Sequence, residues 1–149
     1  MRRKRLLTTL RLWTILSGKK RTKYLRDKRI FAGIGQGSLI MDRRVPLYAE
    51  LIRIGNNVQI ASNVHFVTHD IAHIMLNQMP EEIRAGKTFQ EQLGCIDIRD
   101  NVFIGSGTRI LYNVRIGTNC IIGANSLVNR DIPDNSVAAG IPAKGDWYI

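Results

Sequence analysis

Three histidines and one aspartate form the group of side chains best suited to chemistry in this sequence of 149 residues. His65, His69 and His73 follow one another at intervals of four residues, and Asp70 comes directly after the second of them. Three imidazoles are a set that binds zinc. A single histidine serves instead as a general base, because its ordinary pKa lies close to neutral pH. The elements that carry the histidines decide between these two interpretations.

A six-residue repeat surrounds the histidines along the chain. It is unbroken over 98–133, with an aliphatic residue at the first position and often Gly or Ala at the second. An earlier run covers 54–71, with a fainter start at 34–39. A period of six fits neither a helix nor an alternating strand, and it predicts a three-sided prism of short parallel strands. The leading residues should stack in an inner column at the ~4.8 Å strand spacing. In the unbroken run they are Ile98, Ile104, Ile110, Ile116, Ile122 and Val128.

Asparagines and an insertion complete this pattern. Asparagine tolerates the left-handed conformation that tight corners require, and it recurs in the repeats at 57, 63, 101, 113, 119 and 125. The repeat breaks after Asp70 and leaves about 26 residues out of phase, which predicts an inserted loop over 71–95. A loop of this length in a compact domain is usually functional. The repeat puts His65 at a sixth, turn position, so His65 cannot share a helix with His69. We therefore expect no metal site.

The repeats closely resemble the hexapeptide-repeat acyltransferase family over about 34–145. The segment VNRDIPDNSVAAGIPAK (128–144) is its most specific part. NVHFVTHD (63–70), followed by the insertion, is most similar to the sugar and polysaccharide O-acetyltransferase branch and to its xenobiotic-acetylating relatives. The resemblance implies an all-β fold, a left-handed parallel β-helix that departs from the usual right-handed crossover. To this body we add a short N-terminal helical arm and the long inserted loop.

The resemblance also implies where the chemistry takes place. In the family the catalytic histidine lies where the repeats give way to the loop, and this position corresponds to His69, with His73 as the second candidate. Asp70 either orients an imidazole or begins the turn, and the sequence leaves both alternatives open. Tyr48 and Glu50 are candidates to line the acceptor pocket.

The co-substrate implied by the resemblance is acetyl-CoA, bound in a groove between the β-helices of a homotrimer. Backbone N–H groups near Gly105 and Ser106 would stabilise the oxyanion. Ser106 and Ala124 are 18 residues apart, one full coil, and so should stack on one face. The other cofactor-binding candidates are Asn129, Arg130 and Lys144, with Trp147 near the adenine.

The formal charge of +10 is concentrated at the N-terminus. Residues 1–30 hold twelve basic residues and one acid, whereas 31–149 hold ten basic and eleven acidic residues. We therefore divide the chain into a basic amphipathic arm, 1–30, and a β-helical acetyltransferase domain, 31–149. In the arm, Leu6, Leu10 and Trp13 share one helical face. Three alternatives remain open for the arm: docking of these residues on the body or on a neighbouring subunit, attachment to an anionic membrane surface, or contact with nucleic acid. We expect no nucleic-acid partner, because no groove-reading motif accompanies the charge.

Together these features predict an acetyl-CoA-dependent O-acetyltransferase that acts on a saccharide hydroxyl of a polysaccharide or glycolipid precursor. Two alternatives remain. The first is an enzyme that acetylates a xenobiotic such as an antibiotic, and the second is a non-catalytic β-helix that serves as a binding or scaffold module. Two cysteines cannot form a disulfide framework, and no apolar run approaches the ~20 residues that cross a bilayer. We therefore expect a cytoplasmic protein, with peripheral contact at the inner face of the membrane through 1–30.

Overall fold

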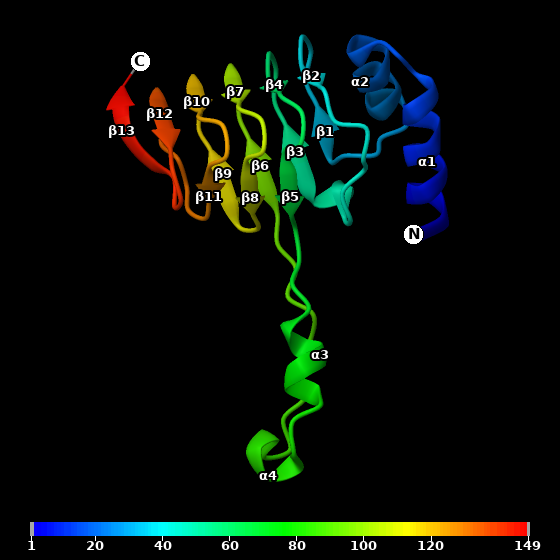
Figure 1. Cartoon of the computed structure of the whole chain (residues 1–149), viewed down its shortest axis with the longest axis vertical. Helices are drawn as coiled ribbons and strands as arrows, with labels where there is room; N and C mark the ends of the chain where they lie inside the picture. The colour runs from blue at the N-terminus through cyan, green and yellow to red at the C-terminus, as the bar shows by residue number, and fades with distance from the viewer. Residues whose placement is uncertain (1, 149) are drawn as a thin grey trace.

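Three parallel sheets form the sides of a prism in the computed structural model, which describes the backbone of residues 2–148 and the side chains of residues 5–145 (Figure 1). Sheet one contains β1 (Gly33–Ile34), β3 (Ile52–Ile54), β6 (Ile96–Ile98) and β9 (Val114–Ile116). Sheet two contains β2 (Leu39–Ile40), β4 (Gln59–Ile60), β7 (Val102–Ile104), β10 (Cys120–Ile122), β12 (Ser136–Ala139) and β13 (Lys144–Tyr148). Sheet three contains β5 (His65–Val67), β8 (Arg109–Leu111) and β11 (Leu127–Val128).

The chain visits the three sheets in turn and so winds into a parallel β-helix. Phe103 of β7 pairs with Ile121 of β10, and Asp97 of β6 pairs with Arg115 of β9, each one coil of 18 residues later. Across the insertion the same neighbours are 44 residues apart, as Gln59 and Phe103 are. The coil therefore accommodates the extra residues without losing register, as the repeat predicts. Only β13, which pairs antiparallel with β12, departs from the parallel pattern among the described strands.

The leading aliphatic residues form the core of the prism. All six residues of the predicted column, from Ile98 to Val128, are 0% exposed. Small or β-branched residues at the fifth position, such as Thr108 and Ser126, are buried beside them. The sixth position lies within the strand and faces outward, as in Phe103 and Ile121. The placement of His65 in a turn is therefore wrong: His65 begins β5, pairs with Arg109 and is exposed.

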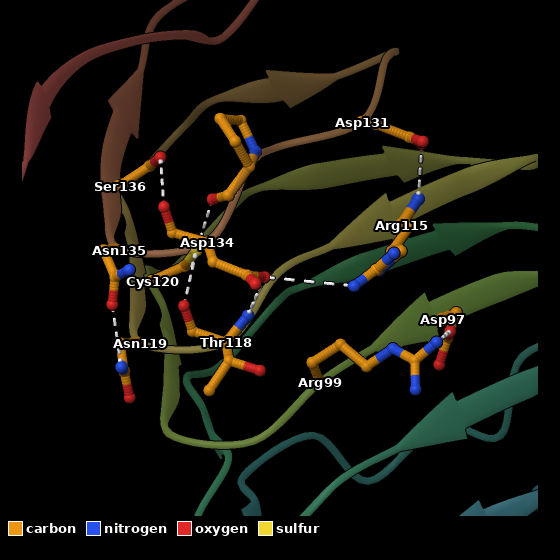
Figure 2. A network of polar contacts seen from close by, with 11 residues as sticks. Asp97, Arg99, Arg115, Thr118, Asn119, Cys120, Asp131, Asp134, Asn135 and Ser136 are labelled. Carbon is orange, nitrogen blue, oxygen red and sulfur yellow. Dashed lines mark hydrogen bonds and ion pairs between the residues drawn. The ribbon is translucent and has the colours of Figure 1, made fainter.

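Asparagines occupy left-handed corners, as predicted. All six of them have positive φ, between 51° at Asn57 and 60° at Asn63. At the corner between sheets one and two, which we call the first corner, their amides form a ladder: Asn57 donates to Asn101, Asn101 to Asn119 and Asn119 to Asn135. Figure 2 shows the last rung, beside the bond that the Thr118 backbone N–H donates to Asp134. These side chains bond one coil to the next where strand pairing is interrupted.

The N-terminal arm forms two helices that pack on the first coil (Figure 1). They are α1 (Arg2–Thr14) and α2 (Gly18–Asp27). Leu12 and Leu25 are buried in the same core as the β-helix. The buried Arg21 donates to the carbonyls of Ile15, Leu16 and Met41, so this cation binds backbone oxygens within the fold. Desolvation lowers the pKa of Arg21, and the neighbouring Arg43 lowers it further.

Docking on the body, one of the alternatives left open for the arm, does not use the face formed by Leu6, Leu10 and Trp13. These residues are 60%, 56% and 61% exposed. Docking uses the opposite side of the helix, where Thr8 and Leu12 are buried. The Arg43 guanidinium contributes by donating to the carbonyls of Leu12, Trp13 and Ile15 at the end of α1. Polar bonds to helix-terminal carbonyls therefore determine the orientation of the arm, together with the burial of Leu12.

The insertion leaves the β-helix between β5 and β6 and extends far from the body (Figure 1). It carries two short helices, α3 (Ala72–Asn77) and α4 (Glu81–Arg84). The side-chain amide of Asn77 accepts from the Phe89 N–H and donates to the Phe89 carbonyl, which joins the outgoing and returning segments. Ile71, Met75 and Ile83 on this projection are exposed.

Candidate active site

His69 is held at the base of the insertion by paired backbone. Gly94 N–H donates to the Thr68 carbonyl at 2.9 Å, and Asp70 N–H donates to the Gln92 carbonyl at 3.1 Å. Between these bonds His69 forms an antiparallel bridge with Leu93. The histidine is therefore fixed by the outgoing and returning segments at the point where the repeats stop, although it lies in a loop.

Tyr48 packs against the His69 ring. The two rings meet edge to face, with centroids 5.5 Å apart. The hydroxyl of Thr68 donates to the Leu47 carbonyl at 2.7 Å, which ties the irregular first coil to the base of the insertion. Tyr48 has a φ of 52° and precedes the short 3₁₀ helix η1 (Ala49–Leu51). Its hydroxyl donates to Glu91 at 2.9 Å, so one side chain connects the first coil, the histidine and the returning segment.

Two imidazole nitrogens at this site have no hydrogen-bond partner. Nδ1 of His69 and Nδ1 of His73 are both inaccessible to solvent and unpaired among the described residues. Buried polar atoms are usually paired, and a catalytic role is one of the explanations for an unpaired one. His65 lies in β5, His69 in the loop and His73 in α3, so the three do not share one helical face. Among the described residues there is no group of three or more His, Cys, Asp or Glu side chains placed to hold a metal ion.

Asp70 anchors the start of the insertion. Its carboxylate accepts from the Ala72 N–H at 3.0 Å and from the Tyr112 hydroxyl at 2.9 Å. The first of these bonds lowers the pKa of Asp70 most, the second lowers it further, and the charges of His73 and His69 add smaller effects. Tyr112 has a raised pKa for the reciprocal reason. Of the two roles left open for Asp70, this geometry matches the start of the turn.

Tyr112→Phe is expected to loosen the entry to the insertion. Removing the hydroxyl leaves Asp70 with the Ala72 bond alone, and its pKa should rise toward the ordinary value. A carboxylate whose pKa is lowered on folding stabilises the folded state at pH values above its ordinary pKa, and this contribution is lost as the pH falls through the folded pKa. At neutral pH the variant should lose part of this contribution. The Ala72 N–H, which donates to Asp70, should then exchange its hydrogen faster. An unchanged exchange rate would show that Tyr112 does not support the turn.

A cavity of about 460 Å³ lies beside His69. It opens between α1, the segment 40–47 and β5, and both His65 and His69 line it. Most of its wall is apolar, whereas Arg5, Asp42 and Arg44 supply charged groups. Neither Tyr48 nor Glu50 lines this cavity: Tyr48 lies next to it through its contact with His69, and Glu50 is exposed on η1. The sequence did not indicate Asp42 or Arg44, because they lie in the irregular first coil.

Three of the predicted cofactor residues stack at the corner between sheets two and three, which we call the second corner. Asn125 N–H donates to the Ser106 carbonyl, and Gly105 N–H donates to the Ile122 carbonyl, each at 2.8 Å. Ser106 and Ala124 therefore lie one above the other, as their spacing of 18 predicts. A Cβ at Gly105 would overlap the backbone of Ala124, so only glycine permits this close approach. Because the Gly105 N–H is bonded between coils, it is not available to an oxyanion.

The remaining predicted cofactor residues are more dispersed. Lys144 begins β13 and pairs with Ala139, which approaches Gly123 at the end of the second corner. Asn129 and Arg130 follow β11 at the corner between sheets three and one, which we call the third corner, and both are exposed. The side chain of Trp147 lies outside the described residues.

Within one chain the candidate catalytic and cofactor residues lie at different corners. His69 and Asp70 occupy the third corner, where the insertion leaves sheet three for sheet one. Ser106 and Ala124 occupy the second corner, on the other side of sheet three. Tyr112, which sequence reasoning missed, lies at the third corner one coil beyond His69. Counting coils across the insertion would have placed it there.

The stacked coils and corners are those of a hexapeptide-repeat β-helix. The family model described as bacterial transferase hexapeptide (six repeats) matches residues 96–130. The predicted resemblance to the hexapeptide-repeat acyltransferases is thereby confirmed. Solved relatives of this type imply that the β-helix is left-handed.

Individual relatives are acetyltransferases. The galactoside O-acetyltransferase of Lactococcus lactis subsp. lactis (strain IL1403) is 39% identical over 93 residues, which are 61% of this chain and 40% of that protein. A maltose O-acetyltransferase from Clostridium difficile 630 has a TM-score of 0.68 and 26% identity, over 99% of this chain and 86% of that one. A hexapeptide-repeat acetyltransferase from Vibrio cholerae O1 biovar eltor, solved with acetyl coenzyme A, has a TM-score of 0.59 and 24% identity, over 95% and 82% of the two chains. The chain spans about two fifths of the length of curated relatives such as the galactoside enzyme.

No helix among the described residues is both long and apolar enough to cross a membrane.

Proposed function

We propose that the chain is an acetyl-CoA-dependent O-acetyltransferase that acts on a saccharide hydroxyl. The observation that carries this proposal is His69, fixed at the base of the insertion with an unpaired Nδ1, beside a cavity and next to Tyr48. Its position in VTHD matches the catalytic histidine of the family. The related galactoside and maltose O-acetyltransferases support the reaction and the substrate class.

In the proposed mechanism His69 acts as the general base. The imidazole takes the proton of the acceptor hydroxyl as that oxygen attacks the thioester carbonyl. The tetrahedral intermediate then collapses with cleavage of the carbon–sulfur bond, and the imidazolium returns the proton to the departing thiolate of CoA. The backbone N–H of Ser106 is the candidate donor to the oxyanion, because the Gly105 N–H is already bonded to Ile122.

Acetyl-CoA is proposed to lie along the second corner. Ser106 and Ala124 provide a stacked, small-residue surface parallel to the prism axis, and Lys144 lies toward its end. An exposed cation there suits a CoA phosphate. Asn129 and Arg130, on the third corner, would reach CoA held against a neighbouring subunit.

A homotrimer with active sites between subunits explains why the two groups of residues are apart. His69 of one subunit would act on acetyl-CoA bound at Ser106 and Ala124 of the next. Phe103 and Ile121, 46% and 41% exposed, form an apolar pair on the outer face of sheet two that fits such a contact.

For the acceptor we propose a polysaccharide or glycolipid precursor. The cavity beside His69 offers Asp42 and Arg44 as groups that hydrogen-bond hydroxyls, within a largely apolar wall. That apolar wall also keeps the antibiotic acceptor as the second candidate.

Acetyl-CoA binding tests the proposal separately from catalysis. At a concentration 100 times its Kd, acetyl-CoA should stabilise the fold by about 2.7 kcal/mol, which corresponds to a rise in Tm of roughly 5–10 °C for a chain of this size. Ala124→Gln should abolish this rise by filling the second corner. Thr118→Gln, at the equivalent third position of its hexapeptide on the first corner, should keep it. No rise in the wild type would favour the non-catalytic scaffold.

A further inference from the structure

Helix α1 presents an apolar face that the described part of the chain leaves exposed. Leu6, Leu10 and Trp13 lie three or four residues apart on this face, and each is more than half exposed. Leu7 and Leu16 extend the surface and are 66% and 86% exposed. The helix is already docked through its other side, where Leu12 is 0% exposed. The exposed residues are therefore not needed to hold α1 on the body.

Cations surround this apolar face. Arg5 and Arg11 are exposed on α1, and Lys19 and Lys20 are exposed directly after the linker that carries Leu16. The single acid of residues 1–30, Asp27, is paired with Lys23 at 2.6 Å. An apolar strip flanked by unpaired cations is the composition of a helix that lies in the interface of an anionic bilayer.

We propose that the exposed face of α1, formed by Leu6, Leu7, Leu10 and Trp13 and extended by Leu16 of the linker, binds the surface of an anionic phospholipid membrane. The charge of the arm favours an anionic membrane over a second copy of the chain. Residues 31–149 carry only one more acid than base, so the body of a second copy offers little charge to complement the arm, and a second arm repels it. Nucleic acid would leave five large apolar side chains in water, whereas a bilayer takes up both the apolar strip and the cations.

Arg43 fixes the end of α1 and the Trp13 ring that would contact the membrane. The Arg43 guanidinium lies 5.4 Å from the centroid of the Trp13 ring and donates to the carbonyls of Leu12, Trp13 and Ile15. The carbonyls of Leu12 and Trp13 near the end of the helix are thus bonded to this guanidinium, which also contacts the indole ring. Arg5 and Leu6 also line the cavity beside His69, so attachment would bring that cavity to the lipid surface.

The fluorescence of Trp13 tests the proposal in the full chain. The sequence has two tryptophans, and Trp147→Phe leaves Trp13 as the sole reporter. Vesicles of phosphatidylcholine with phosphatidylglycerol should shift its emission to the blue and carry the protein upward in a flotation gradient. Phosphatidylcholine vesicles should bind at least ~10-fold less, and added salt should weaken the binding. No shift and no flotation at low salt would overturn the proposal.

Two matched double variants distinguish vesicle binding by the α1 face from non-specific binding by exposed apolar side chains. Leu7→Ser with Leu10→Ser should weaken vesicle binding at least ~10-fold, with Tm unchanged. Met75→Ser with Ile83→Ser removes equally exposed side chains, 59% and 63%, from the insertion and should leave binding unchanged. Equal losses in both variants would contradict the assignment to α1. The proposal fails if wild-type protein does not bind vesicles and the Leu7 and Leu10 changes affect another interaction. A lower mass by light scattering in that variant would assign the face to a second copy of the chain. Weaker binding to duplex DNA would assign it to nucleic acid.

Discussion

His69→Ala is expected to reduce kcat/KM for acetyl transfer at least ~100-fold, the lower end of a general-base contribution. His69 is the imidazole that combines an unpaired Nδ1, paired backbone on both sides and a position on the cavity wall. Without it, nothing at this position accepts the proton of the acceptor hydroxyl. Thiol release from acetyl-CoA in the presence of acceptor measures the loss, and an unchanged Tm shows that the variant is folded.

His73→Ala is the matched control for this variant. His73 also has an unpaired Nδ1, but it lies on α3 and does not line the cavity. The control should lose less than ~10-fold in kcat/KM. If His73→Ala instead abolished transfer while His69→Ala remained active, the base would be His73.

Gly35→Ala should cause the largest loss of stability of any single-methyl change in the first coil. The added Cβ would overlap the backbone of Gly55 and Asn56, where consecutive coils are in direct contact. Gly35 N–H also donates to the carbonyls of Ile54 and Gly55, so the coil cannot move away without breaking bonds. Overpacking of this kind costs about 1–3 kcal/mol and occasionally more, which corresponds to a fall in Tm of roughly 2–12 °C for a chain of this length.

Gly33→Ala, two residues earlier, is the control for this change. A Cβ at Gly33 would meet nothing within 4 Å, and its φ is not positive. Its Tm should stay within about 2 °C of the wild type, consistent with a change in unfolding free energy below ~0.5 kcal/mol. Equal Tm values for the two variants would show that the coils do not stack as closely as described.

Most of the β-helix was predictable from the repeat, because the position of a residue within its hexapeptide predicts whether its side chain is buried or lies at a corner. A leading Ile predicts a buried side chain, and an Asn at the fourth position of the hexapeptide predicts a left-handed corner. Both hold from Ile98 to Val128 and from Asn57 to Asn125. The antiparallel β13 lies past the last repeat, so no periodicity predicted it.

The docking of the arm could not be read from helical spacing. Leu6, Leu10 and Trp13 form the more obvious apolar face, but α1 is fixed by Leu12 and by the bonds from Arg21 and Arg43 to backbone carbonyls. Such bonds depend on where loop carbonyls lie in space. A sequence pattern does not contain that information.

The surroundings of His69 were only partly predictable. The break in the repeat located the histidine. Tyr48, a candidate for the acceptor pocket, contacts the His69 ring but does not line the cavity. Glu91 and Tyr112 were missed because they reach the site from the returning segment and from the next coil. Coil counting across the insertion could have placed Tyr112, whereas Glu91 lies in the out-of-phase segment, which has no repeat spacing to locate it.

The acetylated product is the most direct test of the proposed function. The full-length protein should be incubated with acetyl-CoA and a panel of saccharide, glycolipid and antibiotic acceptors, and the products analysed by mass spectrometry. We predict acceptor-dependent release of CoA thiol together with an acetyl ester on a saccharide hydroxyl, both lost in His69→Ala. Wild-type protein that binds acetyl-CoA yet transfers acetyl to none of these acceptors, or His69→Ala protein that transfers it at the wild-type rate, would contradict the account.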